Sequence, residues 1–93
     1  MKKSYIEKEK IMALKFGNEE VLQDQKLIKI RSRKLKRAER LGNIYKSKAK
    51  IAFKSIEGIF RVETTVWAAT EKFVSLKGGV LIPIHCIKGV EFY

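Results

Sequence analysis

In the segment KLIKIRSRKLKRAERLGNIYKSKAK, residues 26–50, the spacing of the apolar residues changes from one period to another. The segment carries eleven Lys and Arg residues and one acid, Glu39, which gives a net charge of +10. The whole chain carries +11, so the remaining residues are nearly balanced. Before Gly42 the apolar residues recur at helical spacing, and after Asn43 they alternate with period two. The pattern therefore predicts a basic helix followed by strands.

The helix is expected to begin after Asn18 as its N-cap and to end at Leu41, before Gly42. Projected at about 100° per residue, its apolar and basic residues fall on opposite sides. The apolar stripe contains Leu27, Ile28, Leu35, Ala38 and Leu41. The opposite face contains Lys26, Lys29, Arg33, Lys36, Arg37 and Arg40.

Two further cations, Arg31 and Lys34, fall among the apolar residues and are expected to extend past them from the edges of the stripe. The helix dipole favours cations near a C-terminus, but only by about 0.3–1 kcal/mol per charge. The dipole therefore does not account for the eight cations between Lys26 and Arg40.

A second, shorter helix is expected at the start of the chain. Ser4 and Glu7 have the spacing of a capping box, which predicts a helix up to about Lys15. Gly17 would then end it as a left-handed cap.

The segment after Ser47 has the pattern of short strands. Ala49, Ile51 and Phe53 alternate with lysines, which is typical of a half-buried strand with a basic outer face. Gly-containing turns and a proline separate further apolar runs. The expected strands span residues 47–54, 59–69, 73–77, 80–83 and 88–93, with a single helical turn at 84–87.

These elements indicate an α+β fold: a basic N-terminal helix, or two helices, followed by a five-stranded antiparallel small barrel. Residues 1–42 would form a helical basic arm and residues 43–93 the small β-barrel. So few strand residues bury only a small core. The apolar stripe of the helix is therefore expected to pack on the barrel, unless a partner completes it.

The order of elements resembles the SH3-like small barrels, in particular the Sm-like variety. The similar segments are EGIF at 57–60, KGG at 77–79 and IPIHCIKGV at 82–90. Sm-like proteins bind RNA, often as rings, and form a uridine pocket with an Asp-x-x-x-Asn-type loop and an Arg-Gly pair. Here residues 67–72 contain neither Asp nor Asn, and Lys88-Gly89 stands where Arg-Gly is expected. The resemblance therefore implies the fold, and the uridine pocket is not carried over.

The sequence contains no recognisable catalytic constellation. Cys86 is the only cysteine and His85 the only histidine, so we expect no metal site, no cofactor and no disulfide. Cys86 is expected to behave as a small buried hydrophobe. We also expect no signal peptide and no membrane span, because no apolar run is long enough. The lack of an intramolecular disulfide suits a reducing cytosol, so we expect a cytoplasmic location.

The concentrated charge predicts an anionic partner, and RNA is the leading one. A solvated face normally mixes both signs of charge, whereas this segment has a single acid. We therefore expect a small cytosolic RNA-binding protein, associated with the ribosome or another ribonucleoprotein. The expected contacts are Lys26, Lys29, Arg33, Lys36, Arg37, Arg40, Tyr45, Lys46, Lys48 and Lys50.

Other interpretations remain open at this point. The strand lysines, with Lys54, could instead protect a sheet edge from aggregation. Tyr45 is a candidate for base stacking, and Trp67 is expected to dock the helix, with stacking as its alternative. The chain could be a protein-interaction module that uses the apolar stripe of the helix, or a nonspecific DNA-binding protein. Protein partners and a homo-oligomer are left open, and a membrane partner is not expected.

Overall fold

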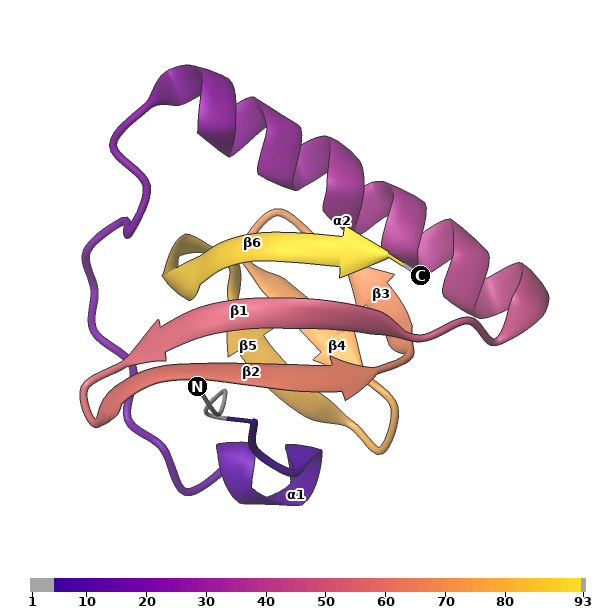
Figure 1. The fold of residues 1–93 in the computed structure, drawn as a ribbon, viewed down its shortest axis with the longest axis horizontal. Helices are drawn as coiled ribbons and strands as arrows, with labels where there is room; N and C mark the ends of the chain where they lie inside the picture. The colour runs from indigo at the N-terminus through magenta and orange to yellow at the C-terminus, as the bar shows by residue number, and fades with distance from the viewer. Residues whose placement is uncertain (1–4, 93) are drawn as a thin grey trace.

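The computed structural model describes residues 5–92 and has the predicted α+β class, with helices first and antiparallel strands after them (Figure 1). Ser4, the expected capping residue of the first helix, and Tyr93, at the end of the last expected strand, lie outside the described residues. The elements in chain order are α1 Lys8–Ile11, α2 Gln25–Tyr45, β1 Ala49–Ser55, β2 Gly58–Thr64, β3 Val66–Ala69, β4 Phe73–Leu76, β5 Val80–Pro83, the 3-10 turn η1 Ile84–Cys86 and β6 Ile87–Phe92.

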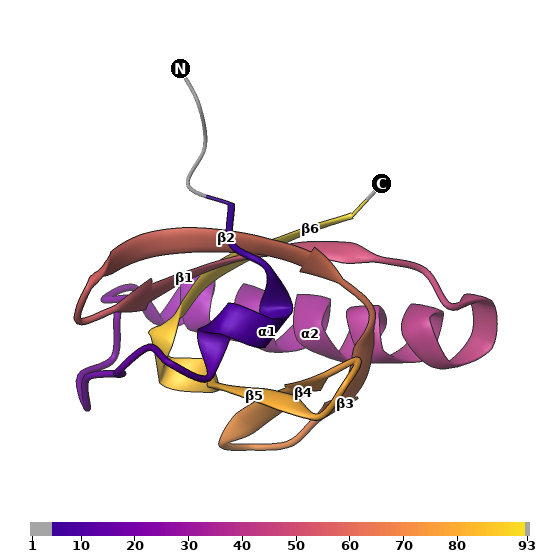
Figure 2. The ribbon, with the colours of Figure 1, turned by 90° about the horizontal axis from the view of Figure 1, so that it is seen from below.

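Within residues 5–92 the six strands form two antiparallel sheets, ordered β2-β1-β6 and β3-β4-β5. Figure 2 shows the two sheets facing each other, with the chain passing from one to the other between β2 and β3. The sequence pattern predicted one strand over residues 59–69, and this prediction was wrong. The strand is interrupted at Thr65, whose carbonyl accepts a hydrogen bond from the Lys77 amide at 3.0 Å. Because of this interruption, the continuous apolar segment 59–69 contributes β2 to one sheet and β3 to the other.

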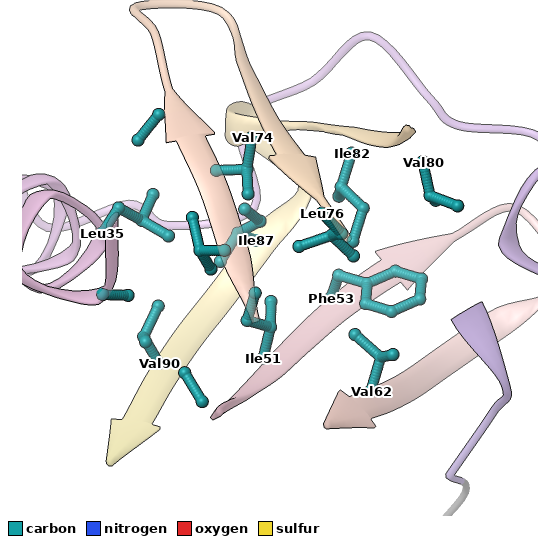
Figure 3. Close-up of a cluster of buried hydrophobic side chains, with 14 of the residues drawn as sticks. Leu35, Ile51, Phe53, Val62, Val74, Leu76, Val80, Ile82, Ile87 and Val90 are labelled. Atoms are coloured by element: carbon teal, nitrogen blue, oxygen red, sulfur yellow. The ribbon is translucent and has the colours of Figure 1, made fainter. Parts of the chain in front are cut away.

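The hydrophobic core lies between the two sheets (Figure 3). Phe53, Ile51 and Val62 contribute from the first sheet, and Leu76 and Ile82 contribute from the second. Ile11 of α1 and Leu35 and Ala38 of α2 belong to the same cluster.

The helix α2 packs against β3 of one sheet and β6 of the other. Leu35 and Ala38 are buried, which confirms that the apolar stripe covers the strands. Ile28 and Leu41 are half-buried, and Leu27 remains 48% exposed. The stripe is therefore narrower than predicted, and its buried line passes through Arg31, Leu35, Ala38 and Gly42.

The bounds of both helices differ from the prediction. The helix α1 has only four residues, and α2 begins at Gln25 with Asp24 as its N-cap, whose carboxylate accepts from the Lys26 amide at 2.8 Å. Asn18 is therefore not the cap. The segment before Asp24 is irregular, with bends at residues 18, 19 and 21, and it is held by contacts with later parts of the chain. The Val21 amide donates to the His85 carbonyl at 2.9 Å, and the Glu20 carboxylate accepts from Arg31 of α2.

The helix also continues through Gly42 to Tyr45 and ends at Lys46, which is left-handed with φ 57°. Gly42 is needed for packing rather than for stopping the helix. A Cβ atom at this position would lie 2.5 Å from the Val66 carbonyl oxygen and 3.0 Å from Thr65 Cγ2. The absence of a side chain lets α2 approach the backbone that joins the two sheets.

We expect Gly42→Ala to lower the free energy of unfolding by about 1–3 kcal/mol because the added methyl group overpacks this contact. The loss should appear although Ala favours a helix over Gly by about 1 kcal/mol. Urea unfolding followed by circular dichroism measures it. Gly89→Ala is the control, since a Cβ atom there meets nothing within 4 Å. A Gly42→Ala protein as stable as the wild type would contradict the close approach.

Candidate nucleic-acid interface

The six cations predicted for the outer face of α2 are all exposed. Five of them follow one another at intervals of three or four residues, so they form a single row along the helix. We call this the basic row: Lys26, Lys29, Arg33, Arg37 and Arg40. An open hollow of about 660 Å³ on this side of α2 is lined by Arg33, Lys36, Arg37 and Arg40, together with Ser32 and Leu41. The basic row is thus a shaped cationic surface.

Lys36, the sixth cation, serves the fold as well as the surface. Its Nζ donates to the Ala69 carbonyl at 2.8 Å, and the Ala69 amide donates to Glu39 Oε2 at 3.1 Å. Lys36 and Glu39 are also 3.7 Å apart as an ion pair. Two side chains of α2 therefore satisfy the backbone of Ala69 at the end of β3. Glu39, the single acid of residues 26–50, therefore has a structural role, because it accepts the hydrogen bond from the Ala69 amide.

Arg37 is held in place by an aromatic ring. Its guanidinium carbon lies 5.2 Å from the centre of the Phe92 ring, at the end of β6. A cation–π contact of this kind orients the arginine and leaves its N–H groups able to donate. Arg37 therefore remains part of the basic row.

Arg31 was predicted to lie at the edge of the apolar stripe, and this prediction was wrong. The side chain is buried within the stripe, with 4% of the residue's surface exposed. Its Nη1 and Nη2 donate to the two carboxylate oxygens of Glu20 at 2.6 and 2.8 Å, and Nη1 also donates to the Ile87 carbonyl at 3.0 Å. The hydrogen bonds from Arg31 are the main cause that lowers the pKa of the Glu20 carboxyl. Arg31 is therefore a structural residue that joins the segment before α2 to β6.

The position of Arg31 carried a signal for this role. It lies four residues before Leu35 and seven before Ala38, on the line that the structure buries. A charged residue on a buried line needs an opposite charge, and the nearest acids upstream apart from Asp24 are Glu20 and Glu19, eleven and twelve residues before Arg31. The sequence did not indicate that these acids leave the helix to reach it.

The predicted strand lysines fall into two groups. Lys46 and Lys48 are exposed in the connection between α2 and β1, and Lys54 is exposed on β1. Lys50 is half-buried, and the strand register places it directly opposite Glu63 on β2 and Glu91 on β6. Acids thus neighbour Lys50 on both sides, whereas Lys46 and Lys48 continue from the basic end of α2.

Two aromatic residues are prominent on the surface. Tyr45 is 70% exposed in the last turn of α2, between the basic row and Lys46. Trp67, which was expected to dock the helix, is 49% exposed on β3.

His85 and Cys86 contact the segment before α2. His85 Nε2 lies 2.7 Å from the Gly17 carbonyl oxygen, and the Cys86 thiol is 3.6 Å from the same oxygen. Cys86 is buried, as predicted, and burial raises its pKa. No cluster of three or more His, Cys, Asp or Glu side chains suited to a metal ion occurs within residues 5–92.

None of the helices described within residues 5–92 is both long and apolar enough to span a bilayer. Comparison with known proteins gives no match, whether to family models, to curated proteins or to solved structures.

Proposed function

We propose that this chain is a small RNA-binding protein in which the basic row of α2 contacts phosphates. The observation that carries the proposal is the absence of any acid on the outer face of α2. Glu39 is the only acid of the helix, and it is half-buried against Ala69. Among residues 5–92 no ion pair involves Lys26, Lys29, Arg33 or Arg40. A cationic row without internal compensation favours an external polyanion.

The length of the basic row favours a polymer over a small anion. Lys26 and Arg40 are separated by fourteen residues, which is about 21 Å along a helix. A nucleic acid presents one phosphate per roughly 3.4 Å of each strand, so several phosphates can face the row at once. Three of the five cations are arginines, which can bind phosphate oxygens with two N–H groups.

We propose structured RNA, in the ribosome or another ribonucleoprotein of the cytoplasm, as the natural partner. The basic row is fixed on a helix that packs against both sheets, so it presents a rigid surface rather than a flexible tail. We further propose that the two sheets together correspond to an Sm-like small barrel, in which the separate strands β2 and β3 take the place of one bent strand. The role proposed is binding rather than catalysis.

A protein-interaction module is the second candidate, and one observation favours it. Leu35 and Ala38 of the predicted stripe are in the core of this chain, but α2 leaves other apolar side chains open. These are Leu27, Ile30, Ile44 and Tyr45, each between 43% and 70% exposed. A salt-insensitive complex of the nuclease-treated protein with itself or with another protein would support this role.

Sedimentation of cell lysate through a sucrose gradient tests the proposal. The protein should move with ribosomal or other ribonucleoprotein particles at low salt, because phosphate contacts are strong there. It should return to the top of the gradient at high salt or after ribonuclease treatment. A protein that stays at the top at low salt would contradict the RNA-binding role.

A further inference from the structure

None of the residues in β3, β4 and β5 is charged, in a chain where 33% of residues are charged. The register pairs Ala68 with Ser75, Ser75 with Leu81, and Phe73 with Pro83, so these residues share one face. The opposite face of the same strands carries the buried residues Val66, Val74, Leu76, Val80 and Ile82. We call the outer face, which carries Ala68, Phe73, Ser75, Leu81 and Pro83, the uncharged sheet face.

Trp67 belongs to the uncharged sheet face because β3 is irregular at this position. The register shifts between Val66 and Ala68, so that Trp67 and Ala68 together stand opposite Ser75. A bulge of this kind turns the extra side chain toward the same side as its neighbour. Trp67 is accordingly 49% exposed, and Phe73 on β4 is 42% exposed. Phe73 is a diagonal neighbour of Ala68, at a typical separation of about 7–8 Å.

Lysines stand at both ends of β4, beside this face. Lys72 precedes Phe73 and Lys77 follows Leu76, and both are exposed. Neither forms an ion pair among residues 5–92. Glu71, in the turn before Lys72, is the one acid at this border. Two exposed aromatic rings between two unpaired cations match a ligand that has both flat rings and negative charges.

The uncharged sheet face is continuous with the basic side of α2. Figure 1 shows β3 as the strand of this sheet that lies next to α2, and Lys36 bonds directly to Ala69 at its end. A hollow of about 570 Å³ lies at this junction, and its lining contains one cation, Lys36, and one acid, Glu71. A bound polyanion that lies along the basic row can therefore continue past β3 onto the uncharged sheet face.

We infer that the uncharged sheet face is a stacking platform for unpaired bases of the RNA whose phosphates contact the basic row. The inference rests on the proposed function and adds the substrate class, RNA with a single-stranded segment. Bases of any sequence stack on exposed aromatic side chains, whereas bases within a duplex have no free face. A second copy of this chain is the less favoured occupant, because a net charge of +11 on each copy opposes self-association.

Trp67 is the only tryptophan of the chain, so its fluorescence reports directly on this face. The probes are a short unstructured single-stranded RNA and a duplex RNA of the same length, titrated into the full chain. The single strand should quench the fluorescence and the duplex should not. Trp67→Ala should weaken binding of the single strand by roughly 5- to 100-fold and leave binding of the duplex unchanged.

Three variants complete the test. Trp67→Phe should retain most of the affinity for the single strand because it keeps an aromatic ring, and Phe73→Ala should weaken binding in the same direction as Trp67→Ala. Tyr5→Ala is the matched control, an exposed aromatic residue that lies against β2 of the other sheet. Circular dichroism checks that each variant is folded.

The failures of the two proposals can be told apart. If the wild type binds neither RNA, the proposed function is overturned and this inference with it. If both RNAs bind but Trp67→Ala and Phe73→Ala have no effect on the single strand, only the stacking platform is overturned. Self-association of the wild type without RNA, abolished by Trp67→Ala, would instead assign this face to contact between copies of the chain.

Discussion

Replacing Glu20 by Ala is expected to lower the free energy of unfolding by about 2–4 kcal/mol. The substitution leaves the Arg31 guanidinium buried without its carboxylate, and an unpaired buried charge is among the most costly single defects. The estimate lies below the usual range of about 3–5 kcal/mol because Glu20 itself retains 33% of its side-chain surface in solvent. Chemical unfolding of the wild type and the variant measures the difference. Equal stability of the two proteins would contradict the role assigned to this ion pair.

The pH dependence of stability gives an independent check on the same pair. The pKa of Glu20 is lowered in the folded chain, so its contribution is present above the unfolded pKa of about 4.3 and is lost as the pH falls through the folded pKa. Glu20→Gln should remove this part of the acid sensitivity. Glu57, whose pKa is lowered chiefly by the hydrogen bond from the Lys15 amide, retains its own contribution in both proteins.

A second control separates the charge from the packing. Replacing Glu20 and Arg31 together by Leu and Met removes both charges and retains apolar volume at Arg31. Exchanges of this type are often neutral or stabilising. The double variant is therefore expected to be more stable than Glu20→Ala alone.

The second large effect is expected on RNA affinity. Lys29→Gln, Arg33→Gln and Arg40→Gln, combined in one variant, should weaken RNA binding about 100-fold or more at low salt, since each lost phosphate contact weakens the binding. These three side chains make no ion pair or hydrogen bond among residues 5–92, so folding should be preserved. Lys36 and Arg37 are left unchanged because they contact Ala69 and Phe92. Filter binding or fluorescence anisotropy with a labelled RNA measures the affinity.

The matched control changes the total charge by the same amount elsewhere. Lys10→Gln, Lys15→Gln and Lys88→Gln remove three exposed lysines that lie outside α2. This variant should lose far less affinity than the variant in the basic row. An equal loss in the two variants would show that net charge, rather than the basic row, determines binding.

Much of the fold followed from periodicity and turn residues. The change from helical to alternating spacing after Asn43 marked the passage from α2 to β1, and the glycines at 78 and 79, both with positive φ, marked the turn between β4 and β5. The errors have a common physical cause. The start of α2, its passage through Gly42 and the break at Thr65 all depend on contacts between segments distant in the sequence, which local spacing does not contain.

The candidate site was predictable to a similar degree. The helical projection placed six cations on the exposed side of α2, where they lie. It did not indicate that Lys36 binds the backbone of β3, or that Lys50 stands between Glu63 and Glu91. These relations depend on strand register and on the packing of α2. The uncharged sheet face likewise becomes visible only once β3, β4 and β5 are aligned.

The salt dependence of RNA binding reports how many cations of α2 contact phosphates. If the five cations of the basic row each neutralise one phosphate, the logarithm of the binding constant should fall against the logarithm of the salt concentration with a slope of about −3.5 for single-stranded RNA. The variant with Gln at residues 29, 33 and 40 should lower the size of this slope by about 2. A slope near zero, or a slope that this variant leaves unchanged, would contradict an RNA interface on α2.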